Sequence, residues 1–198
     1  MTLAVLPAAG ASRRMGRPKL LLPFGATTIV ASLAAALRAG GASMIVVVTA
    51  PEDRALQDHA RGFGAQVAIN PDPSQGMLSS LRAGIAAAGG AEQLARQGEV
   101  LLVAPADLPA LRPATVAELL WRRASAGALL AVPTVHGRRG HPLALAPPLL
   151  TDIETLDLAV GLKQLLERHA SAVLGVPVED GGAVHDVDTP EDYAALTV

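Results

Sequence analysis

Gly10, Arg14, Gly16 and Lys19 have the types and spacing that would hold a polyphosphate. They follow a short apolar run, which predicts a buried strand that ends in a small-residue loop. Glycines let backbone amides approach phosphate oxygens, and arginine and lysine add charge as a planar fork and a compact ammonium. The loop matches neither the P-loop pattern nor the Gly-x-Gly-x-x-Gly dinucleotide pattern. A plain glycine-rich turn is the alternative interpretation.

Three aspartates are candidate ligands for a magnesium ion. Asp107 follows a strongly apolar run and stands between two prolines, which would hold its carboxylate rigidly. Asp186 and Asp188 alternate on an extended segment and so point to the same side. Because Mg²⁺ prefers one or two carboxylates with phosphate oxygens and water, we expect Asp107 and Asp188 to share it, with Asp186 as second choice. A turn or N-cap role for Asp107 is the alternative, and Thr189 with Asp192 predicts a helix start.

Two further segments carry polar side chains suited to ligands. Asn70, Gly76, Ser79 and Ser80 lie where a turn runs into a helical pattern, and their donors and acceptors could read the edge of a nucleobase. A plain helix start is the alternative. Residues 137–142, Gly-Arg-Arg-Gly-His-Pro, form a basic turn suited to a second anionic ligand, with a solvated hairpin as the alternative.

Apolar runs typical of strands alternate with amphipathic patterns typical of helices. The expected strands are residues 3–8, 44–49, 66–69, 99–104, 128–133 and 172–178, and the expected helices are 27–39, 52–62, 77–89, 113–125, 159–169 and 190–196. This alternation predicts an α/β fold with a parallel sheet covered on both faces. No linker, repeat or charge block divides the chain, so we expect a single domain over residues 1–198, with a mobile polar connection at 91–98.

The candidate ligand-binding loops all follow expected strands. Residues 9–19, 70–76 and 105–109 should therefore share the carboxyl edge of the sheet, where ligands bind in such folds.

The composition excludes several classes of function. The chain contains no cysteine, so disulfides, thiolate nucleophiles and cysteine-ligated zinc are ruled out, and the histidines lack zinc-site spacing. A net charge of -2 and only 2% aromatic residues argue against nucleic-acid binding. No apolar run reaches the roughly 18 residues of a membrane span. We find no signal-peptide pattern, so a cytoplasmic location is expected.

Taken together, these segments resemble the molybdenum cofactor cytidylyltransferases, within the nucleotidyltransferases that include guanylyl-transferring relatives and sugar nucleotide pyrophosphorylases. The resemblance runs from about residue 3 to about residue 196. It is carried by Ala-Ala-Gly-Ala-Ser-Arg-Arg-Met-Gly-Arg-Pro-Lys at 8–19, Asn-Pro-Asp-Pro-Ser-Gln-Gly-Met-Leu-Ser-Ser-Leu at 70–81, Gly-Arg-Arg-Gly-His-Pro at 137–142 and Asp-Val-Asp-Thr-Pro-Glu-Asp at 186–192. It implies a Rossmann-like three-layer sandwich of the nucleotide-diphospho-sugar transferase type. A nucleotide-binding half would span about 1–110, and an acceptor-binding half about 111–198.

The resemblance also implies residue roles. The catalytic residues would be Arg14, Lys19 and Asp107. The nucleotide would be bound by Ala8, Ala9, Gly10, Ala11, Ser12, Arg14, Lys19, Asn70, Gly76, Ser79 and Ser80. The acceptor would be bound by Arg139, Gly140, His141 and Lys163, and Mg²⁺ by Asp107, Asp188 and Asp186. Lys163 stands where the family often has arginine.

The implied reaction is transfer of CMP from CTP to a phosphorylated acceptor, with release of pyrophosphate. The implied acceptor is molybdopterin-bound molybdenum cofactor, and a molybdenum hydroxylase would be the client. Ala9, where guanylyl-transferring relatives have glycine, would narrow the pocket toward a pyrimidine. The alternatives are cytidylyl or guanylyl transfer to a sugar or polyol phosphate, and a non-catalytic carrier of the cofactor. A carrier has no need of a two-carboxylate metal site.

Overall fold

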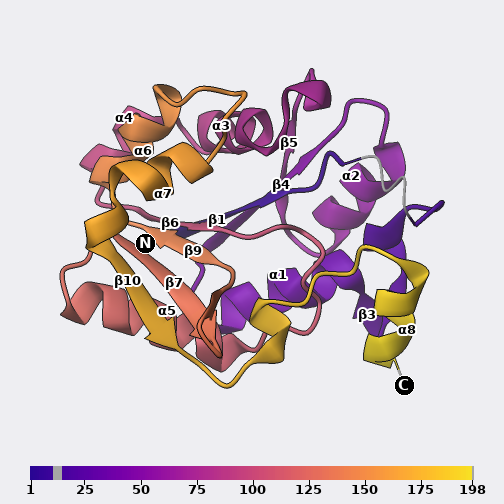
Figure 1. The fold of residues 1–198 in the computed structure, drawn as a ribbon. Coiled ribbons are helices and arrows are strands. Elements are labelled where there is room, and N and C mark those ends of the chain that lie inside the picture. The colour runs from indigo at the N-terminus through magenta and orange to yellow at the C-terminus, as the bar shows by residue number, and fades with distance from the viewer. Residues whose placement is uncertain (11–14, 198) are drawn as a thin grey trace.

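The computed structural model describes residues 1–10 and 15–197. Its centre is a mixed, mostly parallel sheet (Figure 1). The strands are β1 (Thr2–Pro7), β4 (Met44–Thr49), β5 (Gln66–Ile69), β6 (Val100–Val103), β7 (Leu130–Val135), β8 (Arg138–Arg139), β9 (Leu143–Leu145) and β10 (Val173–Pro177). They lie in the order β10-β7-β9-β6-β1-β4-β5, with β8 paired to β7. A separate small sheet joins β2 (Pro23–Phe24) to β3 (Thr27–Thr28).

The parallel part of the sheet is built around β1. This strand pairs in parallel with β4 on one side and β6 on the other, and residues 3–6 are buried. Burial on both faces explains why these strands are continuous apolar runs, as the sequence predicted. Two short strands of this sheet, among the described residues, depart from the parallel pattern: β8 runs antiparallel to β7, and β9 runs antiparallel to both β6 and β7. With three residues, β9 is too short for its apolar run to predict a strand.

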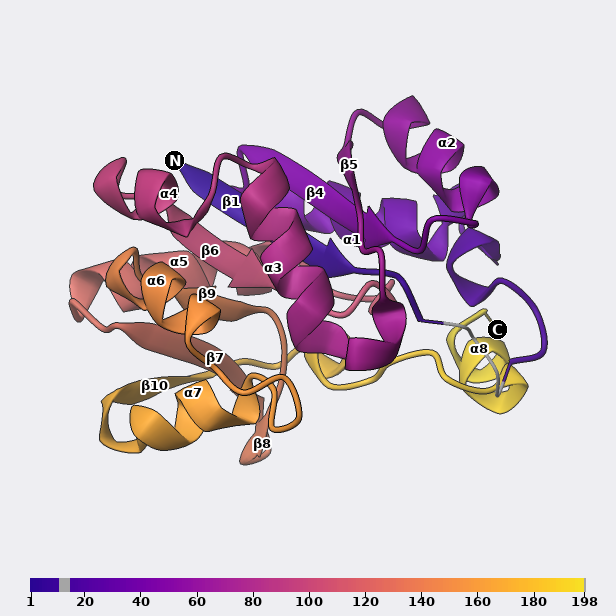
Figure 2. The same ribbon diagram turned by 90° about the horizontal axis from the view of Figure 1, so that it is seen from above.

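Helices cover both faces of the sheet (Figure 2). On one face, α1 (Ile29–Ala39), α2 (Arg54–Gly62) and α5 (Pro113–Ser125) enclose one apolar cluster with Ala4 and Leu6 of β1. On the other, α3 (Met77–Ala87), α4 (Ala91–Arg96), α6 (Pro148–Glu154) and α7 (Lys163–Arg168) enclose a second cluster with Leu3 and Val5. The last helix, α8 (Pro190–Thr197), lies near β3 at one end of the molecule (Figure 1). Single 3₁₀ turns lie at Lys19–Leu21, Pro73–Gln75, Ala170–Ala172 and Gly181–Ala183.

The connection expected at residues 91–98 contains a helix. Residues 91–96 form α4, in which Ala91 and Leu94 are buried while Glu92 and Arg96 form an i,i+4 ion pair of 3.3 Å on the outer face. Because so few positions of this short helix face the core, its composition is polar overall. Helix α6 was also missed, and α7 begins at residue 163 rather than 159.

Candidate active site

The carboxyl ends of β1, β5 and β6 bring the predicted ligand-binding loops to one edge of the sheet (Figure 2). A cavity of about 910 Å³ opens there. It is lined by Ala9, Gly10, Gly16, Arg17, Pro18, Ala50, Glu52, Asp53, Asp72, Pro73 and Ser74. Ala8 is buried beneath it, and its amide continues the β1 pairing by donating to the Val48 carbonyl. The expectation that these loops share an edge is confirmed.

Lys19 lies between two carboxylates. Its Nζ donates to Asp107 Oδ2 at 2.6 Å and to Asp188 Oδ1 at 2.8 Å. The three side chains are only 13%, 15% and 23% exposed, in the order Lys19, Asp107 and Asp188. Burial alone would lower the pKa of Lys19, but the hydrogen bonds and charges of the two aspartates outweigh it and hold the pKa above its ordinary value.

The same carboxylates form an oxygen-rich cluster with Asp186. One oxygen from each of Asp107, Asp186 and Asp188 lies within 4.8 Å of the other two. Asp107 Oδ1 is buried and accepts no hydrogen bond within the described part of the chain. A buried carboxylate oxygen without a donor is costly unless something else compensates it. Carboxylate oxygens are the ligands that Mg²⁺ and Mn²⁺ prefer, so these residues fit a hard divalent cation.

The segment that carries Asp188 is fixed by its neighbours. The amide of Val187 donates to the Asp107 carbonyl at 3.0 Å, and the Val187 side chain is fully buried. At the start of α8, Asp192 Oδ2 accepts hydrogen bonds from the amides of Asp188 and Thr189, and the Thr189 hydroxyl accepts one from the Asp192 amide. The predicted helix start at Thr189 is therefore confirmed, and it also holds the backbone of Asp188.

Asp180, which sequence reasoning missed, anchors the other end of this segment. Its side chain is 3% exposed. It accepts hydrogen bonds from the Arg112 amide at 2.9 Å, the Thr115 hydroxyl at 2.6 Å and the Gly182 amide at 3.0 Å. A Cβ on Gly182 would lie 2.2 Å from the Ala110 carbonyl oxygen, so only glycine allows this close approach. Locally, Asp-Gly-Gly resembles any turn, and no sequence signal identifies its distant partners.

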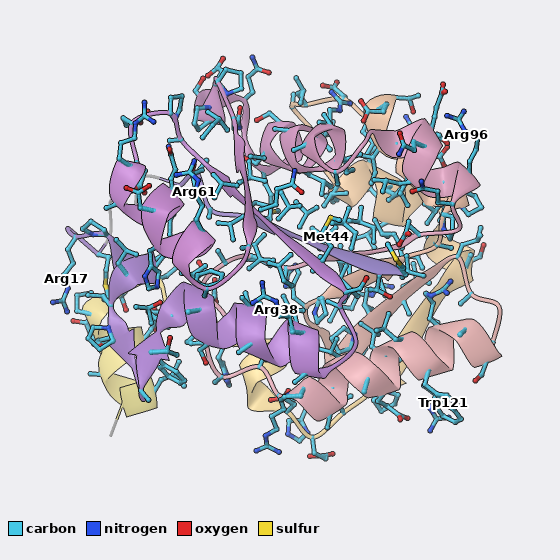
Figure 3. The ribbon with its side chains drawn as sticks, turned by 180° about the vertical axis from the view of Figure 1, so that it is seen from behind. Arg17, Arg38, Met44, Arg61, Arg96 and Trp121 are labelled. Atoms are coloured by element: carbon cyan, nitrogen blue, oxygen red, sulfur yellow. The ribbon has the colours of Figure 1, made fainter. Side chains whose placement is uncertain are left out.

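Arg17 lies at the end of the molecule that carries α8 (Figure 3). Its guanidinium stands 5.8 Å from the centre of the Tyr193 ring. The Tyr193 hydroxyl donates to the Pro23 carbonyl at 2.6 Å. Helix α8 is thereby linked both to the cavity lining and to β2.

The predicted base-binding residues mostly bond to one another. Asn70 is 2% exposed; its amide donates to the hydroxyls of Ser79 and Ser80, and its side-chain oxygen accepts from the Asp72 amide. None of Asn70, Gly76, Ser79 and Ser80 is among the residues that line the cavity, whereas Asp72 is. In the structure, Asn70 shapes the turn that places Asp72 at the cavity wall.

The predicted acceptor residues are spread over two regions. Arg139 is exposed in β8, and Gly140 and His141 pack against residues 181–185, where the His141 amide donates to the Ala183 carbonyl at 2.8 Å. Burial lowers the pKa of His141 below its ordinary value, against the opposing charges of Asp107 and Asp186. Lys163 is 77% exposed and pairs with Glu167 on the surface of α7, away from these contacts.

Three of the predicted nucleotide-binding residues, Ala11, Ser12 and Arg14, lie outside the described residues.

The mostly parallel sheet with helices on both faces is the nucleotide-diphospho-sugar transferase fold, which solved nucleotidyltransferases share. A solved nucleotidyl transferase from a Methanothermobacter species matches with a TM-score of 0.79 and 25% identity, covering 100% of this chain and 96% of that one. A model of the MobA-like NTP transferase domain matches residues 4–173. The chain belongs to the MobA-like NTP transferase family.

Two curated relatives cover nearly the whole chain. The molybdenum cofactor cytidylyltransferase of Escherichia coli is 30% identical over 193 residues, which are 96% of this chain and 92% of that protein. The nicotine blue oxidoreductase of Paenarthrobacter nicotinovorans is 33% identical over 200 residues, which are 97% of this chain and 94% of that protein. Among the described residues, no helix is both long enough and apolar enough to cross a bilayer.

Proposed function

We propose that this nucleotidyltransferase transfers CMP from CTP to molybdopterin-bound molybdenum cofactor and releases pyrophosphate. The observation that carries the proposal is the cluster of Lys19, Asp107 and Asp188 beside the cavity. Similarity to a molybdenum cofactor cytidylyltransferase over 96% of the chain supports the choice of acceptor. We further propose one domain, with a nucleotide-binding half over about residues 1–110 and an acceptor-binding half over about 111–198.

In the proposed reaction, the acceptor phosphate attacks the α-phosphorus of CTP and pyrophosphate leaves. The nucleophile is already anionic, so the chain needs no strong general base; its task is to position the reactants and neutralise charge. Lys19, with Arg14 from the loop, would neutralise the leaving pyrophosphate. A bound Mg²⁺, held by Asp107 and Asp188 with Asp186 beside them, would supply Lewis-acid stabilisation at the α-phosphate. Backbone amides at Gly10 and Gly16 would approach the phosphates, since both residues line the cavity.

Selectivity for cytosine is proposed to begin at Ala9, which lines the cavity and stands where guanylyl-transferring relatives have glycine. Asp72 and Ser74 form another part of the wall and offer polar groups to a base or ribose. Arg139 and His141 are proposed to receive the acceptor, which would approach from the side of residues 181–188.

The test is pyrophosphate release by the purified chain with Mg²⁺, molybdenum cofactor and either CTP or GTP. We expect release with CTP and a much lower kcat/KM with GTP, because a pocket built for one base edge leaves its polar groups unpaired with another. Equal use of GTP would contradict the cytidylyl assignment. Release only with a sugar or polyol phosphate would contradict the acceptor.

The same preparation also distinguishes the remaining functions. Binding of the cofactor without pyrophosphate release, at any nucleotide, would identify a carrier. Because a relative that is 33% identical is an oxidoreductase, oxidation of reduced nicotinamide cofactors should be measured in parallel. Redox turnover without nucleotidyl transfer would reject the proposal.

A further inference from the structure

Lys19 is bonded to the carboxylates in the structure, whereas the proposed function assigns it to the triphosphate. It uses Asp107 Oδ2 at 2.6 Å and Asp188 Oδ1 at 2.8 Å. Each carboxylate has two oxygens, and one oxygen from each of Asp107, Asp186 and Asp188 lies within 4.8 Å of the other two. An ammonium bonded to Asp107 Oδ2 and Asp188 Oδ1 would therefore compete with a divalent cation for these oxygens. Mg²⁺ requires its ligand oxygens about 2.0–2.1 Å away, and such a shell leaves no room for a second cation between the same oxygens.

The pairing cannot simply be given up. Lys19 and Asp107 are mostly buried, and breaking a buried ion pair from one side leaves an uncompensated charge at high cost. If Lys19 leaves, another cation must enter, and if a cation enters, Lys19 must find another anion. The two events are therefore linked.

The cavity that the proposed function assigns to the triphosphate would supply that anion, since Arg17 lines it and its lining continues in the chain up to Pro18, immediately before Lys19. Lys19 is the first residue of a 3₁₀ turn of only three residues, and its flexible stem can direct the ammonium to either side. A triphosphate in the cavity would offer Lys19 oxygens that carry negative charge.

The residue type supports this exchange. The chain has 16 lysines and arginines together, of which only Lys19 and Lys163 are lysines. Arginine would bind a carboxylate through two parallel hydrogen bonds and release it less readily, whereas a lysine ammonium forms a compact, reorientable contact.

We propose that Lys19 is an exchangeable counter-cation that couples binding of the divalent cation to binding of the triphosphate. Its ammonium pairs with the carboxylates until a triphosphate binds; it then pairs with the triphosphate, and a divalent cation replaces it at the carboxylates. This inference rests on the proposed function only in that the site takes a metal–triphosphate. It predicts that a divalent cation alone binds weakly, that a triphosphate tightens this binding, and that Lys19 carries much of the coupling.

The experiment measures free Mn²⁺ by electron paramagnetic resonance with the full chain, with and without inorganic tripolyphosphate. For the wild type we expect tripolyphosphate to tighten Mn²⁺ binding by a factor between about 5 and 150, the usual range for coupled sites. Lys19→Met, which keeps the stem but removes the charge, should bind Mn²⁺ alone about tenfold more tightly than the wild type, with coupling reduced by a similar factor. Lys19→Arg should bind Mn²⁺ alone no better than the wild type. Lys163→Met is the matched control and should change neither value, because Lys163 is 77% exposed and pairs with Glu167.

Lys19→Met that binds Mn²⁺ alone no more tightly than the wild type would overturn the proposal, as would a wild type without coupling. A measurement that needs no variant covers the case in which Lys19→Met does not fold. With only two lysines, labelling lysine at ¹³Cε gives two signals. That of Lys19 should move toward that of exposed Lys163 when Mg²⁺ is saturating, and a Lys19 signal that ignores Mg²⁺ would also overturn the proposal. None of these measurements involves nucleotidyl transfer, so a chain that fails the pyrophosphate assay can still show the exchange, and the reverse.

Discussion

At the scale of single residues, the site is defined by how each charge is compensated. Asp107 shows this most clearly: Oδ2 accepts from Lys19, while buried Oδ1 has no partner within the described part of the chain. The protein thus supplies a hydrogen-bond donor to one oxygen of this carboxylate and leaves the other oxygen to a ligand. A buried polar atom without a hydrogen-bond partner is typical of a functional site, where a ligand or ion supplies the missing partner.

Asp107→Asn should lower kcat by at least about 100-fold at saturating Mg²⁺, because the amide is a weaker ligand and metal stabilisation is worth several kcal/mol. Because Lys19 keeps its bond to Asp188, Asp107→Asn should still fold, which thermal denaturation checks. Asp58→Asn is the control, because that carboxylate is 78% exposed and pairs only with Arg61 at the surface. A near-normal kcat in Asp107→Asn would reject the metal assignment.

His141 gives a second prediction at this scale. Burial lowers its pKa in the folded chain, so the unfolded chain takes up a proton at higher pH than the folded one. The stabilisation is therefore complete above the ordinary histidine pKa of 6.5 and is lost as the pH falls below it toward the lowered folded value. We expect the free energy of unfolding to fall less between pH 7.5 and pH 5.5 in His141→Gln than in the wild type. A His141→Gln slope equal to the wild type would contradict the prediction.

At the scale of elements, the contact between α5 and the turn at residues 181–183 holds the segment that leads to Asp188. Asp180 joins them through the Arg112 amide and the Thr115 hydroxyl. Because Val187 in turn bonds to the Asp107 carbonyl, the segment is fixed at both ends. The positions of the carboxylates therefore depend on Asp180, which contacts none of them.

Thr115→Val, which replaces a buried hydroxyl by a methyl group, should lower the free energy of unfolding by about 2 kcal/mol, the worth of a hydrogen bond to a charged group. It should also raise the Mg²⁺ concentration at half-maximal rate more than it lowers kcat, since the carboxylates would be less well placed. Thr115→Ser restores the hydroxyl and should recover most of both losses. If Thr115→Ser and Thr115→Val behave alike, the hydroxyl is not what matters.

At the scale of the whole molecule, the segments before and after residue 110 are joined across the sheet and also across its face. Arg82 of α3 donates to the carbonyls of Ile153, Glu154 and Leu156, at or just beyond the end of α6. Cations at a helix carboxyl end satisfy free carbonyls and complement its dipole. The helix that follows the Asn70 turn is thereby tied to the segment that leads to α7.

Arg82→Met should lower the free energy of unfolding by at least about 2 kcal/mol, because several partly buried carbonyls lose a charged donor at once. Arg96→Met removes an exposed i,i+4 pair on neighbouring α4 and should cost no more than about 0.5 kcal/mol. Chemical denaturation of the two variants side by side is the measurement. If both variants lose a similarly small free energy of unfolding, the contact between α3 and the end of α6 does not depend on Arg82.

The sequence predicted the parts of the fold that depend on local pattern and missed those that depend on distant partners. Long apolar runs identified β1, β4 and β6, because burial on both faces requires them. Strand β9, with three residues, and the short helix α4 were not predicted, because so few of their positions face the core. The loops could be placed at one edge from chain direction alone, but the side-chain network of Asn70, the Asp180 anchor and the bond between Lys19 and the carboxylates could not. The bonds of Asp180 to α5 and of Lys19 to the carboxylates join residues far apart in the sequence, and the bonds of Asn70 depend on how its turn folds against the start of α3.

The ion pairs of Lys19 also determine which amines of the protein react with acylating reagents. An ammonium that is mostly buried, protonated and bonded twice is a poor nucleophile. The side chains of Lys163 and Met1 are instead 77% and 68% exposed, and each of their amines has a single ion-pair partner within the described part of the chain, at 3.4 and 3.5 Å. Acylating reagents should therefore modify these two outer amines and spare the inner one. A fluorophore or a surface tether could be attached by ordinary amine chemistry, without engineered cysteines and without touching the cavity.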